Sequence, residues 1–208
     1  MLRKISIAAI AVAVSGFSMT ACATTIGIGF TNIGIHAGDG LNMSLPGGSL
    51  TAKQSLGGGY QVNGHFLGAG GENQADFFLG NVGVGKVIPL GEGLGTVTPS
   101  LNMGFQSLNV QGGNLSAATA FARVKYDYAI NHNVNLYAQG GFGRDFATSV
   151  TGISTIGGLM YNAGAGANFR VGPGMFNVGY EYSHLPLSGA AGLHLSTDHF
   201  QIGYSMMF

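Results

Sequence analysis

The sequence predicts an all-β fold: a closed, antiparallel, up-and-down β-barrel that crosses a membrane with its strands. First, large apolar residues alternate with small or polar ones over long runs, which is the period of a strand and not of a helix. Second, charged residues make up only 8% of the 208 residues and mean hydropathy is +0.30, so a soluble barrel would lack its charged coat. Third, no run of 18 apolar residues offers a spanning helix, and closed barrels are the other structure that spans lipid.

Residues 1–23 have the parts of a secretory signal peptide. Two positive charges precede an apolar run at residues 5–14, which is too short to span a bilayer as a helix. A cleavage site of small residues follows at Ala21 and Ala23. We therefore expect the signal peptide to end at Ala23.

The remaining residues, 24–208, are predicted to form one β-barrel domain. Cys22 leaves an alternative open, a lipoprotein signal in which this cysteine is lipidated. Either way, the mature chain has no cysteine pair and no disulfide framework. The net formal charge is zero and no basic cluster occurs, so nothing indicates a nucleic-acid partner.

The first hairpin is the least regular. Two sets of apolar residues alternate in opposite phases (Ile26, Ile28 and Phe30, then Ile33 and Ile35). A β-bulge near residues 31–32 would restore the phase, and we expect one there. Residues 49–56 make a poor strand, and without it the barrel would have eight strands.

Later runs alternate more clearly. They predict strands over residues 97–105, 119–128, 161–170, 176–183 and 200–208. On these runs the apolar face is rimmed by aromatic residues (Tyr126, Tyr128, Phe169, Phe176 and Phe208). That pattern is typical of a lipid-facing band with aromatic girdles, and the face of Gly, Asn, Gln, Ser and Thr would then line the lumen.

Connections are predicted to alternate in length. Short turns are expected at residues 57–59, 89–91, 131–133 and 172–174, and longer polar loops at 112–114, 150–158 and 187–196. The short turns are roughly 40 residues apart, enough for two strands and one outer loop. This spacing gives five hairpins and ten strands, with eight as the alternative.

The C-terminal segment HFQIGYSMMF places five apolar residues on one face (Phe200, Ile202, Tyr204, Met206 and Phe208). It resembles the C-terminal signature of bacterial outer-membrane β-barrel proteins. The whole mature chain resembles the small-barrel class of OmpA- and OmpX-like proteins, and the stretch FTNIG at residues 30–34 resembles the YfaZ group. The resemblance implies a Gram-negative outer membrane, and partners in the barrel-assembly machinery and periplasmic chaperones. The last strand would pair with the first, so that no edge remains.

By phase, five charged residues face the predicted lumen (Arg123, Lys125, Asp127, Arg170 and Glu181), with Lys53 as a sixth candidate. Arg123 and Glu181 each lie about eight residues from a short turn, and we expect them at similar depth. Two interpretations stay open: a charged constriction in a channel, or buried charges that pair and fill the lumen. We favour pairing.

The other candidate residues predict little chemistry. Five histidines are expected near outer strand ends or loops (His36, His65, His184, His194 and His199), and His132 on the periplasmic side. They have no ligand-spaced motif, so we expect no metal and no cofactor. Acidic residues gather toward the outer side (Asp39, Glu72, Asp76, Asp145 and Asp198); they serve solubility, or meet cations that bridge lipopolysaccharide. Neighbours Asp198 and His199 would point to opposite faces of a strand, which disfavours an enzyme.

The sequence therefore predicts a small surface-exposed or structural barrel without enzymatic activity. We expect a monomer in contact with outer-membrane lipid and lipopolysaccharide. Two alternatives remain: a narrow passive channel for small solutes, and adhesion or ligand binding through the outer loops.

Overall fold

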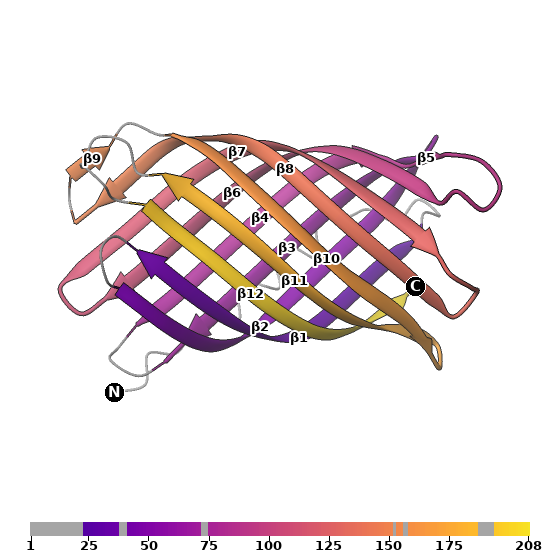
Figure 1. The fold of residues 1–208 in the computed structure, drawn as a ribbon, viewed down its shortest axis with the longest axis horizontal. Helices are drawn as coiled ribbons and strands as arrows, with labels where there is room; N and C mark the ends of the chain where they lie inside the picture. The colour runs from indigo at the N-terminus through magenta and orange to yellow at the C-terminus, as the bar shows by residue number, and fades with distance from the viewer. Residues whose placement is uncertain (1–22, 38–40, 72–74, 152, 156–157, 187–193) are drawn as a thin grey trace.

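The chain forms a closed barrel of ten antiparallel strands in the computed structural model (Figure 1). The structure describes residues 23–37, 41–71, 75–151, 153–155, 158–186 and 194–208. The barrel strands are β1 (Thr24–Ala37), β2 (Leu41–Gly57), β3 (Tyr60–Gly70), β4 (Asp76–Lys86), β6 (Thr96–Val110), β7 (Gly113–Ala129), β8 (Val134–Val150), β10 (Leu159–Val171), β11 (Gly174–Pro186) and β12 (His194–Met207). Ten strands are confirmed, and the eight-strand alternative is wrong.

Two short strands lie beside the barrel wall. β5 (Ile88–Pro89) pairs with β6, and β9 (Ile153–Thr155) pairs with β8. Within the described ranges, no helix has the length and apolar character to cross a bilayer. Residues 1–22 of the predicted signal peptide, with Ala21 and Cys22, lie outside the described residues. Ala23 is described, and its carbonyl accepts a hydrogen bond from the amide of Ser55 at 3.1 Å.

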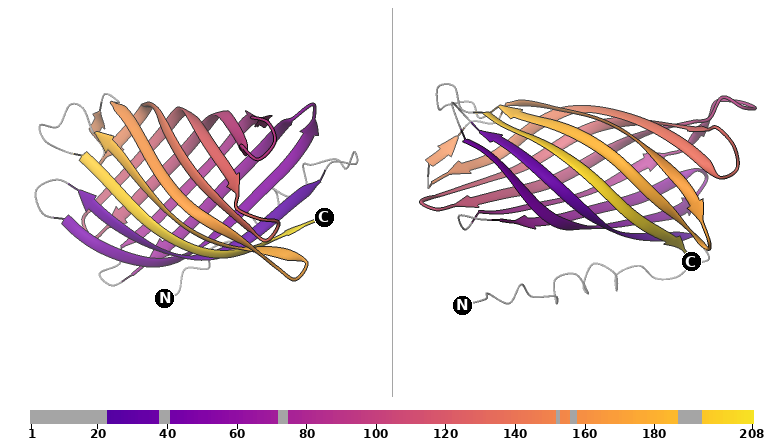
Figure 2. Two further views of the ribbon diagram at one scale, coloured as in Figure 1. Left: turned by 45° about the vertical axis from the view of Figure 1, so that its right-hand side comes forward. Right: turned by 60° about the horizontal axis from the view of Figure 1, so that its bottom comes forward.

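The last strand closes the barrel on the first. β12 pairs antiparallel with β1 without a break, from Met207 opposite Thr25 to Leu195 opposite Ala37, and the two strands lie side by side in both views of Figure 2. Beyond the strand, the amide of Phe208 donates to the carbonyl of Thr24 at 2.8 Å. The alternation of the C-terminal segment is thus explained: it leaves no edge strand, as lipid requires.

The turns largely follow the prediction, with one exchange. The connection at residues 111–112 is a tight turn rather than a long loop, because Gly112 adopts a φ of 89° and lets Val110 pair with Gly113. Residues 87–95, between β4 and β6, were expected as a short turn and instead form a longer connection that contains β5.

The bulge expected near residues 31–32 is wrong. β1 pairs continuously with both neighbours through this point. Phe30 points outward and is 58% exposed, whereas Ile33 points into the barrel and is 1% exposed. The apolar residues change face because their surroundings change along the strand. In the periplasmic part, up to Phe30, they face lipid on the outside of the barrel. In the outer part, from Ile33, they pack inside the barrel.

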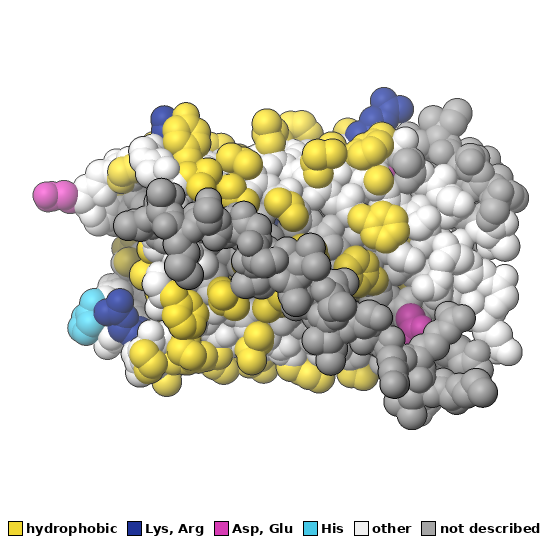
Figure 3. Space-filling model, turned by 180° about the vertical axis from the view of Figure 1, so that it is seen from behind, with side chains coloured by type: hydrophobic (Ala, Val, Ile, Leu, Met, Phe, Trp, Pro, Cys, Tyr) yellow, Lys and Arg dark blue, Asp and Glu magenta, His cyan; other side chains and the backbone are white. Residues whose placement is uncertain are grey.

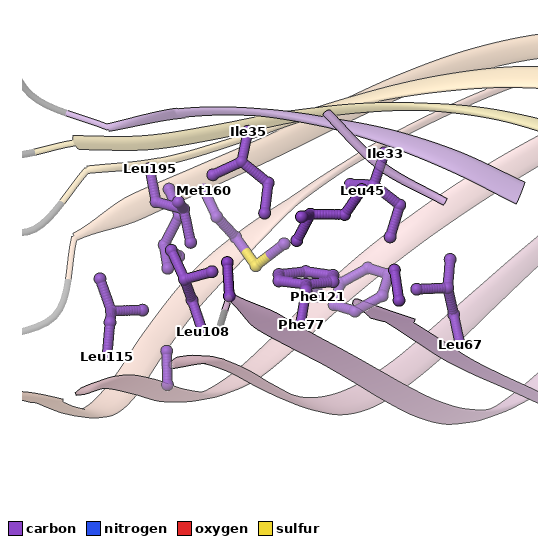
Figure 4. Packing of buried hydrophobic residues seen from close by; sticks show 14 residues of the cluster. Ile33, Ile35, Leu45, Leu67, Phe77, Leu108, Leu115, Phe121, Met160 and Leu195 are labelled. Atoms are coloured by element: carbon purple, nitrogen blue, oxygen red, sulfur yellow. The ribbon is translucent and has the colours of Figure 1, made fainter. Parts of the chain in front are cut away.

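The outer half of the lumen is filled by a cluster of apolar side chains, called here the apolar plug. Its buried members are Ile33, Ile35, Leu45, Leu67, Ala69, Ala75, Phe77, Leu108, Leu115, Ala117, Phe121, Met160, Leu185 and Leu195. They come from strands all round the barrel and point toward one another (Figure 4). Other apolar side chains lie along the outside of the strands (Figure 3), so this barrel buries apolar residues inside and exposes them to lipid outside.

Candidate functional site

An ionic pair lies in the lumen below the apolar plug. Arg123 on β7 donates from Nη2 to Glu181 Oε1 on β11 at 2.8 Å, and the two side chains are 15% and 16% exposed. Gln139 on β8 donates to the other carboxylate oxygen at 2.5 Å. The equal depth expected for Arg123 and Glu181 is confirmed by this contact, which joins strands that are not neighbours in the barrel.

Glycines make room for this pair. Gly141 lies opposite Arg123 in the β7–β8 register, and Gly164 lies opposite Glu181 in the β10–β11 register. A Cβ at Gly141 would come within 2.8 Å of Asn162 Oδ1, and one at Gly164 within 3.2 Å of Glu181 Cβ. Inward-facing glycines therefore let long charged side chains lie across a narrow lumen.

Two histidines lie at the same level. His65 on β3 and His199 on β12 have ring centroids 6.1 Å apart and line the same cavity as Arg123 and Glu181. We expected both near outer strand ends or loops, and that placement is wrong. Both strands extend past these residues toward the outer end, so that inward-facing histidines of β3 and β12 lie within the lumen.

A small cavity with both polar and apolar lining residues lies at this level. Its volume is about 30 Å³, enough for about one or two water molecules. Three buried atoms at its lining residues have no hydrogen-bond partner among the described residues: His65 Nε2, Arg123 Nε and Asn162 Oδ1. A water molecule in the cavity can supply the missing hydrogen bonds of these atoms.

A second ionic pair lies on the periplasmic side of the first. Lys125 Nζ lies 2.8 Å from Oδ1 of Asp127, two residues further along β7. The Lys125 ammonium also lies 4.7 Å from the ring centroid of Tyr137, and Asp127 accepts a bond from Asn135 at 3.3 Å. Lys53 on β2 is close enough to interact electrostatically with both members of the pair. This part of the lumen is polar, unlike the outer half.

Arg170 does not join the other four predicted lumen residues. It lies at the periplasmic end of β10, where it is exposed and its amide donates to the carbonyl of Asn133 at 2.8 Å. The structure thus brings together four of the five residues, as two ionic pairs, and places Arg170 at the rim.

Asp198 and His199 face opposite sides of β12, as their adjacency requires. His199 is 8% exposed inside the lumen, whereas Asp198 faces outward and meets His36 Nε2 at 2.9 Å. Asp145 is fully buried and accepts a bond from Thr148 Oγ1 at 2.5 Å and another from the amide of Gly158. Of the other predicted acids, Asp76 is at the outer end of β4, and Asp39 and Glu72 lie outside the described residues.

The sequence did not reveal a second polar group on the outside of β11 and β12. Ser196 Oγ lies 2.8 Å from His184 Nδ1 and 3.3 Å from the hydroxyl of Tyr182. The His184 ring is 5.5 Å from that of His194. These residues share the outward phase of their strands, which could have predicted the group. The prediction would also have needed the β11–β12 register, which the sequence does not give. In the part of the chain that the structure describes, no three His, Cys, Asp or Glu residues form a group suited to a metal ion.

Comparison with known proteins defines a class. No protein-family model and no curated protein matches the chain. Among solved structures, the outer membrane protease OmpT from Escherichia coli is similar over 92% of this chain and 99% of that chain, at 7% identity and a TM-score of 0.55. An outer membrane channel from Pseudomonas putida F1 is similar over 92% and 97% of the two chains, at 9% identity and a TM-score of 0.52.

The chain therefore has the fold of the small outer-membrane β-barrels, as its resemblance to OmpA- and OmpX-like proteins implied. These two solved structures are of a protease and a channel, so the fold alone does not decide the function. The resemblance to the YfaZ group stays a prediction.

Proposed function

We propose that the protein is a small, surface-exposed barrel of a Gram-negative outer membrane that neither conducts solutes nor catalyses a reaction. The apolar plug carries this proposal. Four of its side chains, those of Ile33, Ile35, Leu45 and Leu195, are at most 2% exposed. Exposing them to open a path would cost about 1.5–3 kcal/mol each, or roughly 6–12 kcal/mol together. An open state would then be rarer than about one molecule in ten thousand.

The ionic pair below the plug supports the same proposal. Arg123 and Glu181 are bonded to each other across the lumen, and the cavity beside them has room for about one or two water molecules. Paired charges that fill a narrow barrel are a packing solution, since an unpaired charge in such a place is costly.

Single-channel conductance of the refolded mature chain in a planar bilayer tests the proposal. A heat-modifiable gel shift first shows that the barrel is folded. We expect a folded and silent protein. Discrete conductance steps in the wild-type chain would contradict the proposal that the apolar plug closes the lumen. They would favour a narrow passive channel.

The polar periplasmic half of the lumen is the observation that favours the channel alternative. Lys53, Lys125 and Asp127 lie there, and the Arg123–Glu181 pair would form the constriction if the plug moved. In that case Glu181→Gln and Arg123→Gln would change ion selectivity in opposite directions, because each removes a charge of opposite sign.

The Ser196 hydroxyl and the His184 imidazole, which face outward, have the residue types of a nucleophile and its base. Their surroundings nevertheless support a non-enzymatic role. A serine nucleophile needs a histidine base that a third group orients. The second ring nitrogen of His184 has no bond to any described residue, and the nearby carboxylate of Asp198 is held by His36. We expect no labelling of the folded protein by a fluorophosphonate probe. Labelling that Ser196→Ala abolishes would show an activated serine.

The remaining parts of the proposal concern export and assembly. We propose that residues 1–23 are removed on export and that the C-terminal face is read by the assembly machinery. The apolar face of the C-terminal segment supports this proposal, since Phe200, Ile202, Met206 and Phe208 are all exposed on it in the folded barrel.

A further inference from the structure

The outward face of the barrel changes from apolar to polar at one level on neighbouring strands. On β12 the last outward apolar residue is Phe200, 44% exposed, and the next outward residue is Asp198. Asn32 on β1 lies directly opposite Phe200 in the register. From Phe208 to Phe200 is eight residues, or roughly 20 Å of height at a rise of about 3.4 Å and a tilt of about 40°. This approaches the band of about 25 Å that such barrels expose to lipid, so Asp198 lies at headgroup level.

A shallow groove, widely open to solvent, lies at this level on the outside of β12, β1 and β2. Its volume is about 450 Å³, and its polar lining comes from the side chains of Asn32, His36, Asn42, Ser44 and Asp198, with Phe200 on the membrane side. Since Phe200 belongs to the lipid-facing band, the groove is continuous with the lipid interface. A molecule that occupies it would have its apolar part in the membrane.

A glycine shapes the floor of the groove. A Cβ at Gly34 would lie 2.7 Å from Asp198 Oδ1 and 2.9 Å from Asp198 Oδ2. Only a residue without a side chain lets the carboxylate of β12 lie across β1 and reach His36. Gly34 faces outward within a continuously paired strand, where no turn requires it.

The hydrogen bonds define what the groove can recognise. His36 Nδ1 lies 2.6 Å from Asn42 Oδ1, and His36 Nε2 lies 2.9 Å from Asp198 Oδ1. Two oxygen acceptors on the two ring nitrogens favour the imidazolium form, whose charge neutralises that of Asp198. Ser44 donates to Asn32 Oδ1 at 2.9 Å. The amide groups of Asn32 and Asn42, and the second oxygen of Asp198, remain able to bind a ligand.

We propose that this groove binds the hydroxylated sugar headgroup of a glycolipid in the outer leaflet. Neutral amides and a carboxylate oxygen donate to and accept from sugar hydroxyls. None of the described lining residues is Lys or Arg, so a phosphate would find no charge-assisted partner apart from the already paired His36. The groove is on the outside of the wall, so this inference does not depend on whether the lumen is sealed.

Histidine NMR on the mature chain, labelled with ¹⁵N-histidine and folded in dodecyldimethylamine oxide micelles, tests the proposal. Dodecyl maltoside supplies a sugar headgroup, and dodecylphosphocholine supplies a phosphate headgroup on the same alkyl chain. We expect the chemical shifts of His36 to change and reach saturation as dodecyl maltoside is added. They should remain unchanged when dodecylphosphocholine is added. His132, exposed in the turn at the opposite rim, is the internal reference and should shift with neither.

Two glycine variants give the matched comparison. Gly34→Leu fills the groove and should raise the half-saturating maltoside fraction at least tenfold. Gly68→Leu adds the same side chain to an outward glycine with open space around it and should leave binding unchanged. If Gly34→Leu does not fold, Asn42→Ala replaces it, with the same tenfold loss expected.

Three results would overturn the inference. They are the lack of a saturating shift with the maltoside, an equal response to the phosphocholine, and a shift that survives both Gly34→Leu and Asn42→Ala. An equal response to the phosphocholine would show that the shift does not depend on the sugar headgroup.

Discussion

Replacing Glu181 by methionine should destabilise the barrel strongly while leaving its shape intact. The substitution keeps the volume and removes the charge, so the guanidinium of Arg123 loses its partner at 2.8 Å and Gln139 loses its acceptor. Breaking a buried pair by removing one member costs about 3–5 kcal/mol. We expect about 3 kcal/mol, the lower end, because the adjacent cavity can supply water to the guanidinium.

Urea unfolding of the refolded chain in lipid vesicles, followed by the heat-modifiable gel shift, measures this loss. With a slope of about 2 kcal/mol per molar urea, a loss of about 3 kcal/mol lowers the midpoint by about 1.5 M. The double variant Arg123→Met, Glu181→Met should recover to within about 1 kcal/mol of the wild type, because two well-packed apolar side chains can replace a buried pair. Asp127→Asn in the more exposed Lys125 pair should cost less than about 1 kcal/mol.

The double variant is the decisive measurement. If Glu181→Met alone costs less than about 1 kcal/mol, the pair is solvated, and the lumen at this level is open to water. The stability losses of Glu181→Met and Arg123→Met are also measured singly. If these two losses simply add in the double variant, the residues do not interact. Either result would refute the paired, packed lumen on which the proposed function relies.

Three further predictions follow from the same structure. Leu45→Ala in the apolar plug should cost about 2–5 kcal/mol in urea unfolding, whereas Leu94→Ala in the exposed periplasmic connection should change stability by less than about 0.5 kcal/mol. Hydrogen bonds to Asn42 and then Asp198 raise the pKa of His36, which lies beyond the lipid-facing band. Its contribution to stability should therefore be full below the unfolded pKa of about 6.5 and fade as pH rises through the folded pKa; His36→Gln should flatten the urea midpoint between pH 5 and about 9. Phe208→Ala should lower the amount of folded barrel in cell membranes but not refolding in micelles, if the resemblance to assembly signals holds.

The favoured strand number, the positions of the four periplasmic connections and the closing strand were predictable because their signals are local. The length of the connection at residues 87–95 was not predicted. Alternation with period two marks most of the strands, and glycines mark three of the four periplasmic connections. The pairing of Arg123 with Glu181 was also within reach, since counting residues from a periplasmic turn gives depth in a barrel. Arg170 fails the same count: it is the second residue before its turn, so phase alone placed it in the lumen when its depth places it at the rim.

The misplaced residues have two physical causes. His65 and His199 were placed at outer strand ends, but β3 and β12 extend further outward than expected. Ile33 and Ile35 were read as lipid-facing residues displaced by a bulge, on the assumption that the outward face stays apolar along the whole strand. Ile33 is buried by residues of strands that are far away in sequence, including Leu195 on β12 and Phe77 on β4. A local sequence pattern therefore could not predict its burial.

The change of face is better understood as one strand crossing two solvents. Below Phe30 the outside is hydrocarbon, which takes apolar side chains and requires only that the backbone be paired. Above Asn32 the outside is headgroups and water, so the wall there faces the situation of a soluble barrel, whose stability comes from apolar side chains inside. A barrel that projects beyond the membrane must therefore fill its outer lumen or remain unstable. The seal over the lumen and the polar groove outside it then have the same origin, since both begin where Phe30 and Phe200 leave the lipid.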